Sequence, residues 1–516
     1  MKTQLHATCA AVGRTVRHCP RALGALRRPA RLIALAAAAA VLVGLALLTA
    51  AGSRSSCDGP CPQTPSSSDG TAVADRFWFV HRGLGPDGSV TVRLADMTGT
   101  ITYPPPDHDE IVPGLVPWAK TGIIVKDGLD QGSDYAALML TGEHGVRFQY
   151  GYTEDVAGPA VEPGTPVWLR LDRDGDRITA STSMDGQAWE EVGTAVLDGL
   201  PETVQAGMFA ASPGDLTVRE TAWGAGLPES RFTQAVGVFD NVAVEGGTVE
   251  GGAGGWASES VGQMNQTDWE KLHNPSGGVE DGGTWTVSGT GDIGPAGVEG
   301  IATVDRLLAG LPFTLAVLVV AAARFGASRE VLTRNDLAAR ATVLGTAVFV
   351  VGLVAAGVAI GAGTAVLEGN GVPVEPLPVR DAARIAAGAA AALALSAVLA
   401  FAIGAWLRRK WTAAVTAVVL IAVPLAVGVL PLLPDAVAQW LLRTTPAAVF
   451  ALKQAVIEYP QVTGYYVPSA GFYPLPGWAG TLVILAYLAV AGWLAVRRAV
   501  PVRAPQQPFS AGVLAR

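Results

Sequence analysis

Residues 32–51, with the sequence LIALAAAAAVLVGLALLTAA, decide the fold class of this chain. They form a run of 20 residues without a charged side chain. A bilayer core of about 30 Å is crossed by roughly 20 apolar residues in a helix. Five later segments are also uncharged over comparable lengths: 307–323, 341–367, 385–407, 411–434 and 478–496. We therefore predict a polytopic α-helical membrane protein with six spans, five of them in a membrane domain of residues 303–498.

The charged residues divide the chain into two kinds of segment. Of its 516 residues, 50% are hydrophobic and 16% are charged, a composition that excludes a disordered chain. Residues 52–302 hold 13 Lys and Arg against 36 Asp and Glu, whereas the remainder holds 23 against 8. The formal net charge of −8 argues against a nucleic-acid partner. We infer an acidic soluble domain inserted into an apolar chain that lies in the lipid bilayer.

Basic residues predict the orientation, because short cytoplasmic segments of membrane proteins are enriched in Lys and Arg. The leader 1–31 has seven of them and no acid, and Arg408-Arg409-Lys410 follows a later span. We predict a multi-pass cell-membrane protein whose leader and tail (499–516) are cytoplasmic and whose residues 52–302 are extracellular. A cleaved signal peptide is the alternative for the first span. The apolar run of this span exceeds the roughly 7–15 residues of the apolar region within a signal peptide, and its basic leader is unusually long, which favours an uncleaved anchor.

The extracellular region 75–246 has the pattern of an all-β domain. Short runs alternate between apolar and polar residues, and Gly, Pro and Asp separate them. The clearest hairpin joins residues 168–172 to residues 177–183 across an Asp174-Gly175 turn. Many short strands of this kind predict a jelly roll or β-sandwich.

Two further segments complete the extracellular part. Residues 52–74 are rich in Ser, Gly, Pro and Thr and are interpreted as a linker. The Gly-rich residues 247–302 are interpreted as the segment that closes the domain above the second span. Cys57 and Cys61 lie just outside the membrane in this interpretation, where a small disulfide is the most reasonable role for them.

Several motifs of the β-rich region resemble the concanavalin/laminin-G-like jelly rolls: GIIVKDG (122–128), WLRL (168–171), SMDGQAW (183–189), VQAGMF (204–209) and FDNV (239–242). The resemblance covers about 75–246. It implies a lectin-like fold and makes cell-wall glycan a candidate partner. Trp78, Trp118, Tyr135 and Tyr150 are rings that could stack on sugars, although aromatic residues of a sandwich usually belong to its core.

We predict no catalytic, cofactor-binding or metal-binding residue in this chain. Glycoside hydrolysis needs two carboxylates across a cleft, and no E-x-D-x-E strand signature occurs. A phosphate-binding P-loop needs a Gly-Lys pair, and no lysine follows a glycine. Asp172, Asp174 and Asp176 resemble the start of a calcium loop, but Arg177 stands where an EF-hand needs Gly, which favours a solvated turn.

Three segments of the membrane half resemble actinobacterial export-type ABC transporter permeases: 285–295, 339–352 and 439–480. The match covers about 280–500. The resemblance implies six spans, both termini inside, and a large extracellular insertion after the first span. It also implies a permease dimer driven by a separate ATPase subunit, and that subunit rather than this chain would bind ATP.

The same resemblance places the docking segment for the ATPase at residues 324–340. Arg329, Glu330 and Arg334 are the candidates for coupling within it. This segment is shorter than in the relatives and lacks their tyrosine- and arginine-rich motif. The alternative that these arginines only set the membrane topology therefore stays open.

The leading functional hypothesis is the transmembrane subunit of an ABC-type exporter with a lectin-like outer domain. The alternative is a cell-surface glycan-binding protein, or a regulatory membrane protein derived from a permease. One span is enough for an anchor, so six spans favour transport. The uncharged spans argue against a proton-coupled pump, because an ionisable residue at mid-bilayer would mark such a pathway.

Overall fold

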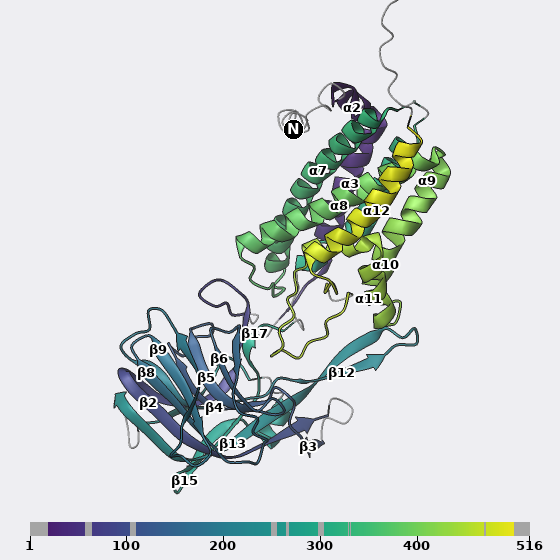
Figure 1. Ribbon diagram of the computed structural model, residues 1–516. Coiled ribbons are helices and arrows are strands. Elements are labelled where there is room, and N and C mark those ends of the chain that lie inside the picture. The colour runs from purple at the N-terminus through teal and green to yellow at the C-terminus, as the bar shows by residue number, and fades with distance from the viewer. Residues whose placement is uncertain are drawn as a thin grey trace, which may run out of the picture.

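The computed structural model describes residues 19–56, 64–103, 110–248, 255–264, 268–297, 304–328, 330, 332–468 and 471–499. A bundle of apolar helices forms one half of the molecule and a β-rich domain forms the other (Figure 1). The β-rich domain lies beyond one end of the bundle, and the short helix α2 (Cys19–Leu26) lies at the opposite end (Figure 1).

The bundle contains long helices joined mostly by short turns, and a longer connection joins η3 to α12. Its remaining elements are α3 (Pro29–Gly52), α5 (Val304–Leu307), α6 (Leu311–Gly326), α7 (Arg334–Gly369), α8 (Val379–Leu407), α9 (Lys410–Ala417), the π-helical turn η2 (Val418–Ala422), α10 (Val423–Val429), α11 (Asp435–Thr444), the 3₁₀ helix η3 (Pro446–Lys453) and α12 (Gly477–Arg497).

Five helices in the described part of the chain are long and apolar enough to cross a membrane: α3, α7, α8, the continuous α9–α10 unit and α12. The expected second span corresponds to α6, which has only 16 residues. At 1.5 Å per residue it is about 24 Å long, less than the roughly 30 Å of a bilayer core. Five of the six predicted spans therefore correspond to helices that are long enough to cross a bilayer, and the second predicted span does not.

The shortness of α6 has a local cause. The apolar run expected to begin at residue 307 is interrupted after α5, and a new helix begins with Gly310 as its N-cap and Pro312 in its first turn. Proline is favoured in that turn because its missing N–H is not needed there. Only Leu307 of the run therefore belongs to α5, and the helical part of the run is α6.

Glycines bring the bundle helices into backbone contact. A Cβ atom on Gly326 of α6 would lie 2.0 Å from the carbonyl oxygen of Phe401 in α8, and one on Gly404 would lie 2.1 Å from that of Ala323. Small residues at helix crossings permit this close approach, which drives packing between membrane helices. The apolar core of the bundle is built entirely from bundle residues.

The β-rich domain contains seventeen strands and one short helix within the described residues: β1 (Val73–Asp75), β2 (Phe77–Thr102), β3 (Ile111–Pro113), β4 (Lys120–Lys126), β5 (Tyr135–Thr141), β6 (Val146–Tyr150), β7 (Glu154–Ala157), β8 (Val167–Asp174), β9 (Arg177–Ser183), β10 (Glu190–Val196), β11 (Val204–Ala211), β12 (Asp215–Glu220), β13 (Gly226–Thr248), β14 (Ala257–Val261), α4 (Asp268–His273), β15 (Gly277–Asp281), β16 (Thr284–Gly289) and β17 (Ile293–Pro295).

Fifteen of these described strands belong to one antiparallel sheet, and the long strands β2 and β13 connect its parts. The main strand order is β10-β9-β8-β2-β11-β4-β5-β6-β7. The predicted hairpin is confirmed as β8 and β9, with Gly175 in the left-handed conformation at φ 60°. The sheet also continues past residue 246, because β13 crosses that position and β14 to β16 extend the pairing.

Two apolar clusters cover the two faces of this sheet. On β4, Ile123 and Val125 belong to the larger cluster, whereas Ile124 between them belongs to the smaller one. This alternation is the period of two expected of a strand that is buried on both faces. The smaller cluster is completed by Val73 of β1 and Ile293 of β17, so these two strands cover one face of the sheet.

The chain enters and leaves the domain at one place. β1 pairs antiparallel with β17, and just beyond them the N–H of Ala296 donates to the carbonyl oxygen of Ala72 over 3.4 Å. The domain also contacts the bundle side of the molecule, where Gln461 donates to the carbonyl oxygen of Thr153 over 2.9 Å. The hairpin of β12 and β13 reaches toward α11 (Figure 1).

Candidate functional site

The turn between α6 and α7 carries a cluster of ionic contacts. Glu330 accepts a hydrogen bond from Arg28 over 3.0 Å and a second one from Arg340. The Arg31 guanidinium lies 3.8 Å from the centroid of the Phe325 ring. The cluster therefore links the end of the leader to both helices of the turn.

The electrostatic environment keeps Glu330 ionised. The hydrogen bond from Arg340 and the positive charges of Arg340 and Arg28 lower the pKa of this carboxyl below its usual value, although partial burial opposes them. Glu330 is half-exposed, and surface ion pairs of this kind contribute at most about 1 kcal/mol each. The cluster joins the leader to α7 and adds little to the stability of the whole protein.

The coupling candidates have different places at this turn. Glu330 is held within the cluster, whereas Arg334 is exposed at the first position of α7. Arg329 lies outside the described residues, as do Cys57 and Cys61. Sequence reasoning did not identify Arg28 and Arg340 as the partners of Glu330. The sequence feature that pointed toward such pairing is that Glu330 and Asp336 are the only acids among the basic residues of 324–340.

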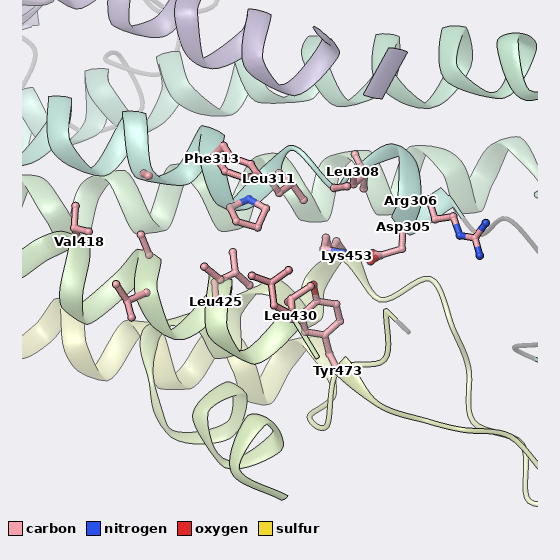
Figure 2. A pocket seen from close by; sticks show the side chains of 17 residues that line it. Asp305, Arg306, Leu308, Leu311, Phe313, Val418, Leu425, Leu430, Lys453 and Tyr473 are labelled. Carbon is pink, nitrogen blue, oxygen red and sulfur yellow. Dashed lines mark hydrogen bonds and ion pairs between the residues drawn. The ribbon is translucent and has the colours of Figure 1, made fainter. Parts of the chain in front are cut away.

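A hollow of about 560 Å³ lies between α5–α6 on one side and η2–α10 on the other. Apolar side chains form most of its wall, among them Leu308, Phe313, Leu425 and Leu430. Figure 2 shows Val418 at one end of the hollow and polar side chains at the other. Its volume falls in the range of about 300–1,000 Å³ that is usual for sites of small ligands.

The polar end of the hollow contains a buried ion pair. Lys453 of η3 donates to Asp305 of α5, and its ammonium lies 4.8 Å from the centroid of the Tyr473 ring (Figure 2). Burial lowers the pKa of Lys453, but the charge of Asp305 outweighs it and raises the pKa above its usual value. Burial raises the pKa of Tyr473 to about 12. Lys453 is therefore a cation and Tyr473 a neutral phenol at neutral pH.

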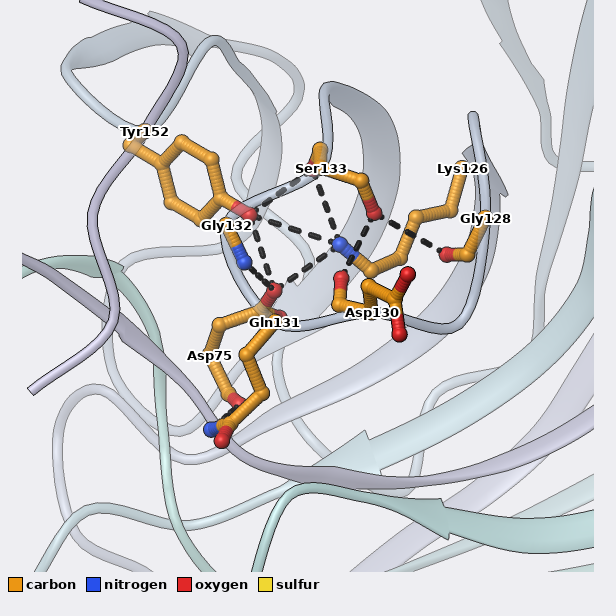
Figure 3. A network of polar contacts seen from close by, with 8 residues as sticks. All are labelled: Asp75, Lys126, Gly128, Asp130, Gln131, Gly132, Ser133 and Tyr152. Atoms are coloured by element: carbon orange, nitrogen blue, oxygen red, sulfur yellow. Dashed lines mark hydrogen bonds and ion pairs between the residues drawn. The ribbon is translucent and has the colours of Figure 1, made fainter. Parts of the chain in front are cut away.

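A second buried network lies in the β-rich domain, around Lys126 at the end of β4 (Figure 3). Its ammonium donates to Asp75 and to the carbonyl oxygen of Ser133, each over 2.8 Å. Tyr152 donates to the same Asp75 oxygen over 2.8 Å. Lys126 and Asp75 are both fully buried, so each charge depends on the other for compensation.

The opposite end of β4 repeats this arrangement. Lys120 contacts Asp292 at 2.5 Å and the carbonyl oxygen of Ile293 at 2.6 Å. Asp75 ends β1 and Asp292 precedes β17, so the two lysines hold both connections of the domain against one strand. These buried charges serve the attachment of β1 and β17.

The four aromatic residues considered for sugar stacking do not form a shared platform. Tyr135 is fully buried and packs edge-on against Tyr152, and Trp118 is also buried. Trp78 and Tyr150 are half-buried, and Trp78 donates to Ser258 over 3.0 Å. The residues that the structure describes also contain no group of three or more side chains that could hold a metal ion.

Comparisons with known proteins do not assign this chain to a family. No protein-family model and no curated protein matches the chain. A functionally unknown protein from Saccharomyces cerevisiae is 14% identical over 32% of this chain and 71% of its own, with a TM-score of 0.19. A scytalido-glutamic peptidase is 9% identical over 42% and 98%, with a TM-score of 0.26. The alginate lyase from Klebsiella pneumoniae is 13% identical over 31% and 60%, with a TM-score of 0.18. Similarity this low carries no functional argument.

Proposed function

We propose that this chain is the transmembrane subunit of an ABC-type exporter, energised by a separate ATPase subunit that binds ATP. In this proposal α6 is a sixth, short span, the permease forms a dimer, both termini are cytoplasmic and residues 52–302 lie outside the cell. The lectin-like identity of the outer domain and its candidate glycan partner belong to the same proposal.

The ionic contacts of Glu330, between α6 and α7, are the observation that carries this proposal. They lie at the end of the bundle that is remote from the β-rich domain (Figure 1). Glu330 pairs there with Arg28 and Arg340, and Arg334 is exposed at the start of α7. An anchored carboxylate with an exposed cation nearby offers a soluble partner a charged contact, which a segment that only set topology would not need.

The lengths of the helices support transport over simple anchoring. One helix anchors a domain, whereas five described helices are long enough to cross a bilayer and pack around a common core. A glycan-binding surface protein receives less support, because β1 and β17 cover one face of the sheet and Tyr135 is inside the protein.

The test is purification of the full chain from its own cells with identification of whatever copurifies. We expect a soluble ATPase in stoichiometric amount. Arg334→Glu should reduce the copurified ATPase at least about ten-fold, because an unfavourable charge at an interface costs several kcal/mol. Arg380→Glu is the matched control, since Arg380 is exposed at the other end of the bundle and should change nothing.

Equal recovery of the ATPase with Arg334→Glu and with the control would show that the turn is not the docking site. A wild-type protein without any ATPase, but with cell-wall glycan retained on its outer domain, would instead support the surface-binding alternative. Recovery of the protein without an ATPase and without glycan would support the regulatory membrane protein derived from a permease.

A further inference from the structure

The hollow beside α6 belongs to a longer groove on the outside of the bundle. A second hollow of about 350 Å³ begins at Val418, which lines both, and continues along α9 to Arg324 and Lys410. Its wall is also apolar, with Val320 of α6 facing Val415 of α9. The groove thus extends from Arg306 of α5 along α6 to Arg324 near its end.

Two features of the sequence make room for this groove. Small side chains line it on both sides, including Ala309, Ala316, Ala422 and Ala426. Pro424 has no backbone N–H to continue the regular helix, and the π-helical turn η2 directly precedes α10, in whose first turn it lies. Single π-helical turns inside α-helices are frequent at functional sites.

The groove opens to the surroundings of the bundle. Phe313 on one wall is 63% exposed and Val419 on the other is 59% exposed. These apolar residues lie on helices that face lipid if the bundle crosses a membrane. An occupant that is itself apolar along most of its length would cover them.

Cations mark both ends of the groove. Arg306 is exposed at one end, and Arg324 and Lys410 are exposed at the other. None of these three has an ion-pair partner within the described ranges, whereas the Lys453–Asp305 pair is neutral overall. The groove is therefore complementary to a long apolar chain with an anionic group at its end.

We propose that the groove binds an anionic phospholipid, with its phosphate beside Arg306 and its acyl chain between α6 and α10. Basic residues near a membrane surface attract anionic headgroups, and the short α6 favours local thinning that brings headgroups closer to the groove. This binding does not depend on whether the chain is an exporter.

The experiment uses the full chain in phosphatidylcholine nanodiscs that contain a small fraction of phosphatidylglycerol with a photoreactive acyl chain. After illumination, mass spectrometry of peptides locates the label. We expect labelling concentrated in residues 308–316 and 418–430, and competition by unlabelled phosphatidylglycerol but not by phosphatidylcholine.

Matched variants separate the headgroup from the acyl chain. Arg306→Gln should reduce the specific labelling about five-fold, the effect of losing one cation near an anionic lipid, while Arg380→Gln at the same end of the bundle should not. Ala426→Phe should fill the hollow and abolish labelling there. Val354→Phe adds the same ring at an exposed position of α7 outside the groove and should leave the labelling unchanged.

Labelling spread evenly over the exposed faces of all the helices would overturn the proposal. So would equal competition by the neutral lipid, or unchanged labelling after Arg306→Gln. Protection of the groove in a dimer, with labelling that appears only when the dimer is dissociated, would assign the groove to a second copy of the chain.

Discussion

Lys126 illustrates how the β-rich domain depends on individual buried charges. The side chain ends a strand that is buried along its whole length, and Asp75 is its ionic partner. Burial lowers the pKa of Lys126 below its usual value, although the negative charge of Asp75 acts in the opposite direction. A pair of this kind adds little net stability over an apolar pair, but the loss of one partner leaves a charge without compensation.

Replacement of Lys126 by Met should therefore destabilise the domain by about 3–5 kcal/mol, because Asp75 would remain buried and alone. The double variant Lys126→Met with Asp75→Leu should recover most of that loss. Hydrogen–deuterium exchange of the β4 and β5 amides in the full chain measures the effect. Arg219→Met at the exposed pair with Glu229 is the control and should cost no more than about 1 kcal/mol. A small effect of Lys126→Met would contradict this account.

Tyr135 and Tyr152 predict how the domain responds to alkaline pH. Burial, and then the negative charge of Asp75, raise the pKa of both phenols above the usual value of about 10. Their contribution to stability is fully present below about pH 10 and is lost as the pH rises further, because the unfolded chain releases protons that the folded chain retains.

Phenolate absorbance of the full chain during alkaline titration tests this expectation. We expect a cooperative step well above pH 10 in which the buried phenols ionise as the domain unfolds. Tyr152→Phe should remove one phenolate from that step. Gradual ionisation of every tyrosine near pH 10, without a cooperative step, would show that these phenols are accessible to solvent.

At the scale of elements, the carboxylate of Glu330 connects the end of the leader with α7. Glu330 joins Arg28, the N-cap of α3, to Arg340 on α7, so it ties the junction that follows α2 to α7. The lowered pKa of Glu330 keeps this tie fully present above about pH 4.5, and it is lost only as the pH falls through the lower folded pKa.

Glu330→Gln should loosen α2 without unfolding the bundle. Because exposed ion pairs contribute about 0.2–1 kcal/mol, we expect amide exchange in α2 to accelerate about two- to five-fold at neutral pH. Glu368→Gln, at the exposed far end of α7, should leave α2 unchanged. The same protection of α2 in both variants would mean that its apolar contacts with the bundle are sufficient.

At the scale of the whole molecule, the two halves have separate cores, and the two chain connections between them lie side by side. Among the residues that the structure describes, the bundle core contains none from the β-rich domain, and the two clusters of that domain contain none from the bundle. The pairing of β1 with β17 and the bond between Ala296 and Ala72 bring the two connections together.

The bundle should accordingly fold without the outer domain. Replacement of residues 73–295 by a short Gly-Ser linker should leave a helical protein that elutes as a single species in detergent. Circular dichroism and size-exclusion chromatography check this outcome. Aggregation of the shortened chain would show that contacts such as Gln461 with Thr153 are needed for the bundle to form.

The sequence by itself determined the division into an apolar helical half and a β-rich half. Uncharged runs of bilayer length and the alternation around the Asp174-Gly175 turn are local patterns, and local patterns are sufficient to identify long helices and hairpins. The resemblance named Glu330 and Arg334 as coupling candidates, which remains a prediction, and sequence reasoning indicated neither the partners of Glu330 nor the groove beside α6.

Only the tertiary structure decided which charges are paired and where the bundle is hollow. Lys453 and Asp305 are 148 positions apart, and Lys126 and Asp75 are 51 apart. No periodicity in the chain relates residues at such separations, because their contact depends on how complete helices and strands pack. The interruption of the second apolar run before α6 also required the structure, since hydropathy does not register a turn within an uncharged segment.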